Sequence, residues 1–284
     1  MSSGDGWTTC ALGHRHWGLF GAAGLLLRTP ADEASAVGLQ LRAERSHHGG
    51  TWGILGGARH EDETPVQAAL REAAEEAGVE PERVEVEAGY VDDHGGWTYT
   101  TIVASASSAM ALAPRNWESD AVAWVPLVEI DGLALHPGFA STWPLLRQVG
   151  PAPLVVVDAA NVVGSRPDGW WRDRAGAAER LRDQLAAAAE SGVEGLGPPS
   201  PPGLRTYPAF VLVVEGAARD VAGVPGVEVL SASGSGDDAV VAAVAERRDR
   251  GRPVRVVTAD RELRRRVEAL GAGVLGPRTL LDLL

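Results

Sequence analysis

Residues 57–79 of the chain read GARHEDETPVQAALREAAEEAGV, and this stretch decides how the first half of the chain folds. Thr64 and Gln67 are spaced as a capping box, in which each side chain bonds the backbone N–H of the other residue. Pro65 then falls at the first helical position, where a missing N–H does no harm. Gly78 stands where a left-handed residue ends a helix. The stretch therefore predicts a helix that begins at Pro65 and ends before Gly78.

Three glutamates share one face of this helix. Glu72, Glu75 and Glu76 fall at i, i+3 and i+4, and residues at these spacings are neighbours on a helix surface. Their charges repel one another unless a cation lies among them, and Mg²⁺ takes oxygen ligands of this kind. We expect Arg71 to point away from the trio, with Glu63 in the preceding loop as its partner. A plain solvated acidic face is the alternative, which the fixed offsets of the glycine, arginine and glutamates disfavour.

The same stretch resembles the Nudix box, G-x5-E-x7-R-E-U-x-E-E-x-G-U, with a small residue, Ala73, at the first aliphatic position. The resemblance implies a hydrolase, dependent on Mg²⁺ or Mn²⁺, of nucleoside diphosphates linked to another moiety. It also implies an α/β/α sandwich with a mixed sheet, in which the box forms a loop, a helix and a loop. By the resemblance, the carbonyl oxygen of Gly57 is a metal ligand together with Glu72, Glu75 and Glu76.

A further acid outside the box is a candidate for the same site. Many Nudix enzymes place a glutamate about six residues before a tryptophan at the end of the sheet, and Glu118 and Trp124 have this spacing. Glu118 would be a metal ligand or the base that activates water, and Glu75 or Glu76 could also be that base. Divalent ions neutralise a diphosphate and make water nucleophilic, and a nearby carboxylate completes the proton transfer. Alternatively, Glu118 and Asp120 are ordinary loop acids.

The Nudix box does not indicate which residues bind the substrate. Trp97 is a candidate to stack on a nucleobase, because its ring offers a large flat face. Arg42 is a candidate to meet phosphate groups. Several other aromatic residues could take the stacking role: Trp7, Trp17, Trp52, Tyr99 and Trp117. For each aromatic residue a place in the core is the alternative, and for Arg42 an ordinary surface position.

The number of cysteines indicates the redox state of the compartment and limits the kinds of metal site that the chain can form. Cys10 is the only cysteine, which excludes an internal disulfide and suits a reducing cytoplasm. Cys10, His14 and His16 are residues of the types that bind metals. A structural zinc site is nevertheless not favoured, because the sequence shows one cysteine and no second cluster of ligands.

Length and charge indicate two domains. The chain has 284 residues, enough for two ordinary domains, and a net charge of −12. Residues 1–150 carry 9 arginines against 20 acidic residues, a balance of −11, whereas residues 151–284 carry 17 against 18, a balance of −1. The seam at residues 148–153 contains two prolines and a glycine. We therefore expect domains at 1–150 and 153–284.

The beginning of the sequence predicts neither export nor a membrane partner. It lacks the basic start and the long apolar run of a signal peptide. The longest early apolar run, residues 19–27, is broken by glycines and is too short to span a bilayer. The sequence therefore favours a cytoplasmic protein that does not enter a membrane.

The second half contains four largely apolar runs, which are typical of buried parallel strands. These runs are residues 154–157, 210–214, 227–230 and 254–257, and helical stretches alternate with them. The alternation favours a doubly wound α/β layer, in which sites form beyond the carboxyl ends of the strands. Asp158, Glu215 and Asp260 stand at or just beyond such ends.

Three short motifs in this half are similar to those of PIN-like nucleases of the NYN/YacP-type branch. They are V-D-x-x-N at 157–161, G-D-D at 236–238 and V-V-T-x-D at 256–260, with glycine where the family more often has alanine in the second motif. The resemblance implies that Asp158, Asp237 or Asp238, and Asp260 hold Mg²⁺ or Mn²⁺ for phosphodiester cleavage, and that Asn161 steadies the site. Alternatively, the first-turn acids Asp237 and Asp238 only complement a helix dipole.

Together these features predict a two-domain hydrolase: a Nudix pyrophosphohydrolase followed by a metal-dependent ribonuclease. RNA is a candidate partner, because the first unit could strip a 5′ phosphate or cap and the second could cut the exposed strand. One alternative is a house-cleaning pyrophosphatase that acts on the nucleotide pool. Another is a sensor of an ADP-ribose-type metabolite joined to a PIN-like domain that holds RNA without cutting it.

Overall fold

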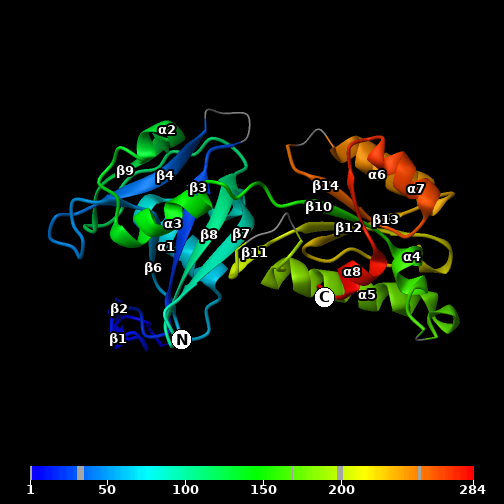
Figure 1. Cartoon of the computed structure of the whole chain (residues 1–284), viewed down its shortest axis with the longest axis horizontal. Coiled ribbons are helices and arrows are strands. Elements are labelled where there is room, and N and C mark those ends of the chain that lie inside the picture. Colours follow the sequence, from blue (N-terminus) through cyan, green and yellow to red (C-terminus); the bar gives the residue numbers. More distant parts are fainter. Residues whose placement is uncertain (1, 31–34, 168, 197–200, 249–250) are drawn as a thin grey trace. The chain divides into compact units, whose positions relative to one another are not determined.

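The computed structural model describes residues 2–30, 35–167, 169–196, 201–248 and 251–284, and it divides into two compact units. The first unit comprises Met1–Gly150 and Pro202–Leu204, and the second comprises Pro151–Pro201 and Arg205–Leu284. Figure 1 shows the helices and strands of each unit.

A mixed sheet forms the centre of the first unit. Strand β3 (Ala22–Arg28) runs parallel to β8 (Thr98–Ala106) and antiparallel to β4 (Ala36–Arg42). The predicted hairpin is confirmed, because β7 (Val84–Asp93) pairs antiparallel with β8. The remaining strands of this sheet within the unit are β5 (Trp52–Gly53), β6 (Leu55–Ala58) and β9 (Ser119–Pro126).

Helices cover both faces of this sheet, as expected for an α/β/α sandwich. Successive residues of a strand point to opposite faces. Leu25 and Leu27 of β3 accordingly join the core cluster beneath helix α1 (Pro65–Ala77). Leu26 joins the cluster that contains the buried residues of α3 (Pro137–Leu146).

Helix α1 begins and ends as the sequence predicts. The capping box is present in full, with Thr64 accepting from the Gln67 N–H and the Gln67 side chain accepting from the Thr64 N–H. Gly78 adopts the left-handed conformation, with φ of 72°. Alanines form most of the buried face of the helix, and Ala73 is fully buried among them. Their small side chains let the helix backbone approach the sheet closely.

A separate two-stranded hairpin precedes the sheet. It consists of β1 (Trp7–Thr9) and β2 (Arg15–Trp17), which pair antiparallel. No pattern in the sequence predicts this hairpin, because each strand has only three residues and no run of apolar side chains.

The second unit contains a five-stranded parallel sheet in the order β13-β12-β10-β14-β15. The four predicted strands are confirmed as β10, β12, β13 and β14, whereas β15 was not predicted. Val155 and Val157 of β10 pack with α4, α5 and α8, and Val156 packs with α6 and α7. The sheet is therefore covered on both faces. Its strands are β10 (Leu154–Asp158), β12 (Ala209–Val214), β13 (Val227–Ser231), β14 (Val254–Val257) and β15 (Gly273–Leu275).

The other elements connect or cover these sheets. Strand β11 (Leu204–Thr206) begins at the last residue of the segment that groups with the first unit. The helices not yet given bounds are α2 (Leu127–Ile130), α4 (Ala159–Gly164), α5 (Arg174–Ser191), α6 (Gly236–Arg247), α7 (Arg261–Glu268), α8 (Pro277–Leu281) and the 3₁₀ turns η1 (Pro81–Arg83), η2 (Trp170–Arg172) and η3 (Gly216–Ala218). Within the described residues, no helix combines the length and the apolar character needed to cross a membrane.

The capping box yields a stability prediction. Thr64→Ala removes the side-chain acceptor for the Gln67 N–H, and loss of such a cap costs about 1 kcal/mol. Thr64→Ser keeps the hydroxyl and should unfold close to the wild-type midpoint. Urea unfolding of the full chain, followed by tryptophan fluorescence, measures the difference. Equal midpoints for the alanine variant and the wild type would show that the box does not stabilise the helix.

Candidate active site

The carboxylate of Glu76 lies where strand β6 approaches helix α1. Its Oε2 accepts hydrogen bonds from the Gly56 N–H, at 2.8 Å, and from Gln40 Nε2, at 3.1 Å. Gly57 is adjacent, and a Cβ atom placed on it would lie 2.6 Å from Cδ of Glu72. The absence of a side chain at position 57 therefore leaves the Glu72 carboxylate directly against the backbone of β6.

Burial makes the charge of Glu76 costly in the absence of a cation. The side chain is only 2% exposed. Burial raises the pKa of Glu76 to about 8, and the charges of Glu72 and Glu118 add to the rise, against the hydrogen bonds from Gly56 and Gln40. At neutral pH the carboxyl group therefore tends to retain a proton, and a bound cation would take the place of that proton.

Glu118 joins this group although it comes from a different segment. It lies just before β9, where its backbone carbonyl accepts from the Ala43 N–H at 2.8 Å. Burial is the main cause that raises the pKa of Glu72, and the charges of Glu75 and Glu118 raise it further. Because Glu118 acts on both Glu72 and Glu76, the structure brings the loop acid and the helix acids into one electrostatic group.

Arg71 differs from the expectation that it points away from the glutamates. Its predicted partner is confirmed, because Nε donates to Glu63 Oε1 at 2.8 Å and Nη2 donates to Glu63 Oε2 at 2.9 Å. However, Nη1 also donates to Glu72 at 2.7 Å and to Glu75 at 3.4 Å. The guanidinium carries five donors on a rigid plane and can serve both sides at once. These hydrogen bonds raise the pKa of Arg71.

The acids around β6 are not drawn together as a closed cage. Among the residues that the structure describes, no three of the predicted acidic ligands have oxygens all within 4.8 Å of one another. Glu75 is the most open of the helix trio, with 59% of its side chain exposed. The acids have other partners, namely a backbone amide, a glutamine and an arginine. An all-oxygen donor set with a buried carboxylate and an adjacent glycine carbonyl suits a hard divalent ion such as Mg²⁺.

The two substrate-binding candidates lie in different surroundings. Arg42 is partly exposed, and its Nε donates to the backbone carbonyl of His47 at 3.0 Å. Trp97 is only 8% exposed, its ring is stacked on His16, and its Nε1 donates to the Gly18 carbonyl at 2.9 Å. Trp97 therefore belongs to the core, which was its alternative interpretation, and offers no open face to a base.

A group of three histidines beside Arg42 was not predicted from the sequence. His47, His48 and His136 have ligand-type nitrogens all within 4.8 Å of one another. Burial lowers the pKa of His136 to about 4, and the positive charges of His48, Arg42 and His47 lower it further. His48 has a φ of 57°, which is unusual for a residue with a side chain. The signal in the sequence was the pair of adjacent histidines, but His136 joins them only through the fold.

In the second unit, Asp158 and Asn161 connect two segments at the carboxyl edge of the sheet. Asp158 ends β10 and accepts hydrogen bonds from the Asn161 N–H at 3.1 Å and from the Thr258 hydroxyl at 3.2 Å. The Asn161 side-chain oxygen accepts from the Ala259 N–H at 2.8 Å. Asp260 caps α7 by accepting from a backbone N–H of that helix. The first and third motifs are thus adjacent in space.

The remaining acids of this edge divide into two kinds. Burial raises the pKa of Asp158, and the charges of Asp237 and Glu215 contribute; the pKa of Asp237 is also raised, by burial and by Asp260. Asp238 instead accepts from Arg266 Nη2 at 2.6 Å. Of the two neighbouring aspartates, Asp237 is therefore the one that shares its electrostatic surroundings with the strand-end acids.

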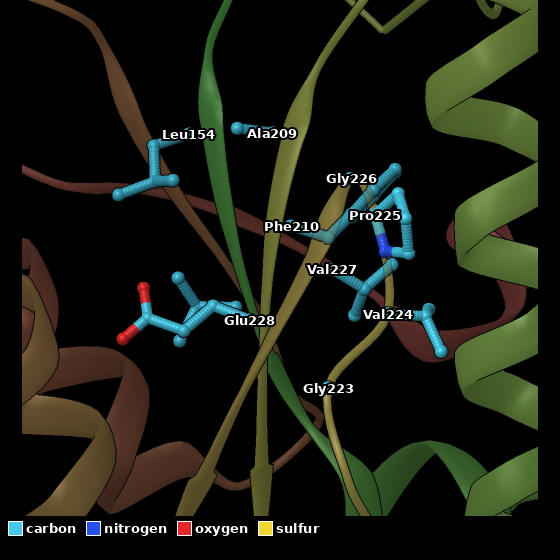
Figure 2. Close-up of a pocket in the computed structure, with 10 residues that line it drawn as sticks. Leu154, Ala209, Phe210, Gly223, Val224, Pro225, Gly226, Val227 and Glu228 are labelled. Carbon is cyan, nitrogen blue, oxygen red and sulfur yellow. The ribbon is translucent and has the colours of Figure 1, made fainter.

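A hollow in the second unit lies at the opposite end of the sheet. Its volume is about 590 Å³, and it is bordered by the first residues of β10, β12 and β13 and by the turn Gly223–Gly226 (Figure 2). In Figure 2 the carboxylate of Glu228 lies away from Val224 and Pro225, and its Oε1 accepts from Arg247 at 2.8 Å. The lining is otherwise mostly apolar, so this hollow offers no catalytic chemistry.

Comparisons with known proteins concern the first unit. The NUDIX domain family matches residues 19–149. A Mycobacterium tuberculosis protein named "Putative 8-oxo-dGTP diphosphatase 3" is 51% identical over 151 residues, which cover 51% of this chain and 69% of that protein. A Bifidobacterium longum protein named "Nucleoside triphosphate pyrophosphatase/Nudix hydrolase fusion protein" is 42% identical over 146 residues, which cover 50% of this chain and 30% of that protein.

A solved structure is similar over the same half of the chain. It is the crystal structure of RenU, a Nudix hydrolase from M. smegmatis, with 47% identity and a TM-score of 0.48. The match covers 51% of this chain and 94% of that one. The family match and the identity to the M. tuberculosis protein agree with the glutamate helix, the glycine strand and the sandwich described above. The chain belongs to the Nudix family, and its Nudix domain lies within the first unit.

Proposed function

We propose that the first unit hydrolyses a phosphoanhydride bond of a nucleoside di- or triphosphate derivative with the help of Mg²⁺ or Mn²⁺. The observation that carries this proposal is the buried carboxylate of Glu76, held beside Glu72 and within the field of Glu118. Uncompensated negative charge is unfavourable at such a depth, and a divalent ion compensates it. The carbonyl of Gly57, with Glu72, Glu75 and Glu76, would hold that ion.

Each side chain has a distinct part in the proposed reaction. A divalent ion supplies charge neutralisation for the phosphates and lowers the pKa of water. We favour Glu118 as the base, because it comes from a segment outside α1 and its charge acts on both Glu72 and Glu76. Glu75 instead accepts a hydrogen bond from Arg71. Arg71 and Glu63 position the helix acids through their paired hydrogen bonds. Glu118 would take a proton from water, the water oxygen would bond to a phosphorus atom of the anhydride, and the bridging P–O bond would break. The leaving group departs with the bridging oxygen as a phosphate, pyrophosphate or nucleotide.

For the substrate we favour an oxidised purine nucleoside triphosphate. The M. tuberculosis protein that is 51% identical over 151 residues is named for 8-oxo-dGTP. That identity concerns the unit in which the acids lie, and the activity would clear damaged nucleotides from the pool. Other nucleoside diphosphate derivatives, ADP-ribose among them, and the 5′ end of RNA are the competing substrates.

Glutamine variants test the acidic group. We expect Glu76→Gln and Glu118→Gln each to lower kcat about 10²-fold or more, because the first loses a metal-binding charge and the second the base. Loss of substrate and formation of products are measured by chromatography with 8-oxo-dGTP, dGTP, ADP-ribose and 5′-triphosphorylated RNA, with Mg²⁺ and with Mn²⁺. Glu129→Gln, at an exposed glutamate of α2, is the matched control and should retain wild-type turnover.

Two outcomes would contradict this assignment. One is full turnover by Glu76→Gln, and the other is a wild-type protein that hydrolyses no substrate of the panel with either ion. Preference for 5′-triphosphorylated RNA over every free nucleotide would replace the house-cleaning assignment with one at RNA ends. Tight binding of ADP-ribose without turnover would indicate a sensor.

For the second unit, residues 153–284, we propose a PIN-like domain that cleaves RNA with Mg²⁺ or Mn²⁺. The supporting observation is the group of aspartates at the carboxyl edge of the parallel sheet. Burial and the charge of Asp237 raise the pKa of Asp158, and burial and the charge of Asp260 raise the pKa of Asp237. Ligand sites in open α/β sheets form at this edge. Asn161 steadies the group by bonding the segment that follows β14.

An aspartate variant tests the nuclease proposal. Asp158→Asn should lower cleavage of single-stranded RNA about 10²-fold, because it removes a buried charge that the metal needs. The same variant should leave hydrolysis of nucleotides by the first unit unchanged. Asp220→Asn, at an exposed position, serves as the control. RNA that stays intact with the wild-type protein, or cleavage that survives Asp158→Asn, would refute the proposal.

A further inference from the structure

Four metal-ligand side chains meet at the turn of the β1–β2 hairpin. Cys10, His14 and His16 come from the hairpin, and His94 comes from the turn between β7 and β8. Their candidate ligand atoms all lie within 4.8 Å of one another. Ligands held about 2.1–2.3 Å from a tetrahedral zinc ion lie about 3.5 Å apart, so a small contraction brings these four to bonding distance.

Two of the ring nitrogens are buried without a partner. Nε2 of His16 and Nδ1 of His94 are shielded from solvent, and neither has a hydrogen-bond partner among the residues that the structure describes. Such orphaned atoms are costly in a protein interior. Each lies on a residue of the four-ligand group, so a metal ion at its centre would satisfy both nitrogens at once.

His94 has a carboxylate neighbour of the kind that metal-bound histidines often have, and the ring of His16 is held by stacking. Nε2 of His94 lies 3.3 Å from Oδ2 of Asp92, which leaves Nδ1 free to face the group. Histidines that bind metals commonly donate their second N–H to a carboxylate in this way. The ring of His16 is stacked on Trp97 with centroids 3.9 Å apart, which fixes its orientation.

Backbone hydrogen bonds shape the hairpin turn and join it to the β7–β8 turn. The Cys10 carbonyl accepts from the Gly13 N–H, and the Cys10 N–H donates to the His14 carbonyl, both at 3.0 Å. The Ala11 N–H donates to the Gly95 carbonyl at 2.8 Å. Gly95 has a φ of 72°, and a Cβ atom placed there would lie 2.9 Å from Cβ of Ala11. Glycine therefore permits the close approach that brings His94 to the hairpin.

We propose that Cys10, His14, His16 and His94 bind one Zn²⁺ ion in a closed structural site. One thiolate and three imidazoles suit zinc, whereas Mg²⁺ prefers oxygen ligands, so this site is chemically distinct from the glutamate group of the first unit. Cys10 binds as the thiolate and releases its proton on binding. With all four positions filled by protein, the ion has no open position for a substrate.

The consequence is a cross-link between the hairpin and the main sheet. A two-stranded hairpin alone is marginally stable in water. Zinc bound by these four side chains joins the hairpin to the β7–β8 turn. The other histidine group, His47, His48 and His136, lacks a cysteine and is largely exposed, so it serves as a comparison.

Metal content tests the proposal directly. Protein purified without a histidine tag and dialysed against metal-free buffer should retain about one Zn²⁺ per chain by mass spectrometry. Cys10→Ser and His94→Ala should each lose most of it. His47→Ala and Glu76→Gln, which remove a histidine and an acid elsewhere, should keep the wild-type content. Zinc retained by both ligand variants, or lost equally by the controls, would overturn the proposal.

Cobalt substitution covers the case in which a ligand variant fails to fold. The wild-type protein, stripped of zinc and titrated with Co²⁺, should show the strong visible bands of a tetrahedral ion and a thiolate charge-transfer band in the near ultraviolet. Zinc should abolish both and raise the thermal midpoint by about 5 °C or more. The weak spectrum of an octahedral ion, or no thermal shift with zinc, would contradict a closed site at Cys10.

Discussion

A carboxylate held almost entirely out of water, that of Glu76, sets the requirements for the rest of the first unit. Burying an ionised group without compensation is among the most costly events in folding. Here a backbone amide of β6 and the amide of Gln40 provide part of the compensation, while Glu72 and Glu118 work against it. A divalent cation would supply the charge compensation that these two hydrogen bonds do not provide. The same geometry would therefore favour a bound divalent cation.

The fold keeps this carboxylate in place from both sides. Alanines on the inner face of α1 let the helix lie close to β3 and β6, and the glycines of β6 bring its backbone against the acids. Arg71 ties the helix to the preceding loop and to the carbonyl of Ala58. Small residues and one arginine thus fix the position of the acids, whereas the larger side chains of the sheet supply the core.

Many of these elements and contacts can be predicted from the spacing of residues that are close together in the sequence. The caps of α1, the Arg71–Glu63 pair and the apolar strands of the second half follow from neighbours in the sequence or from runs of one residue type. Short elements such as β1, β2 and β15 carry too few residues for a pattern. The bonds from Arg71 to Glu72 and Glu75 depend on side-chain conformations that spacing does not determine. His94 reaches Cys10 only because two distant turns meet, and a single sequence carries no signal of that meeting.

The central claim is that the acids of α1 and the carbonyl of Gly57 surround a divalent ion. Anomalous diffraction from crystals soaked in Mn²⁺, collected near the manganese edge, tests it most directly. We predict a peak within bonding distance of the Gly57 carbonyl oxygen and of carboxylate oxygens from Glu72 and Glu76. Manganese bound only elsewhere in a well-ordered crystal, with Glu76 still bonded to Gly56 and Gln40, would contradict the account.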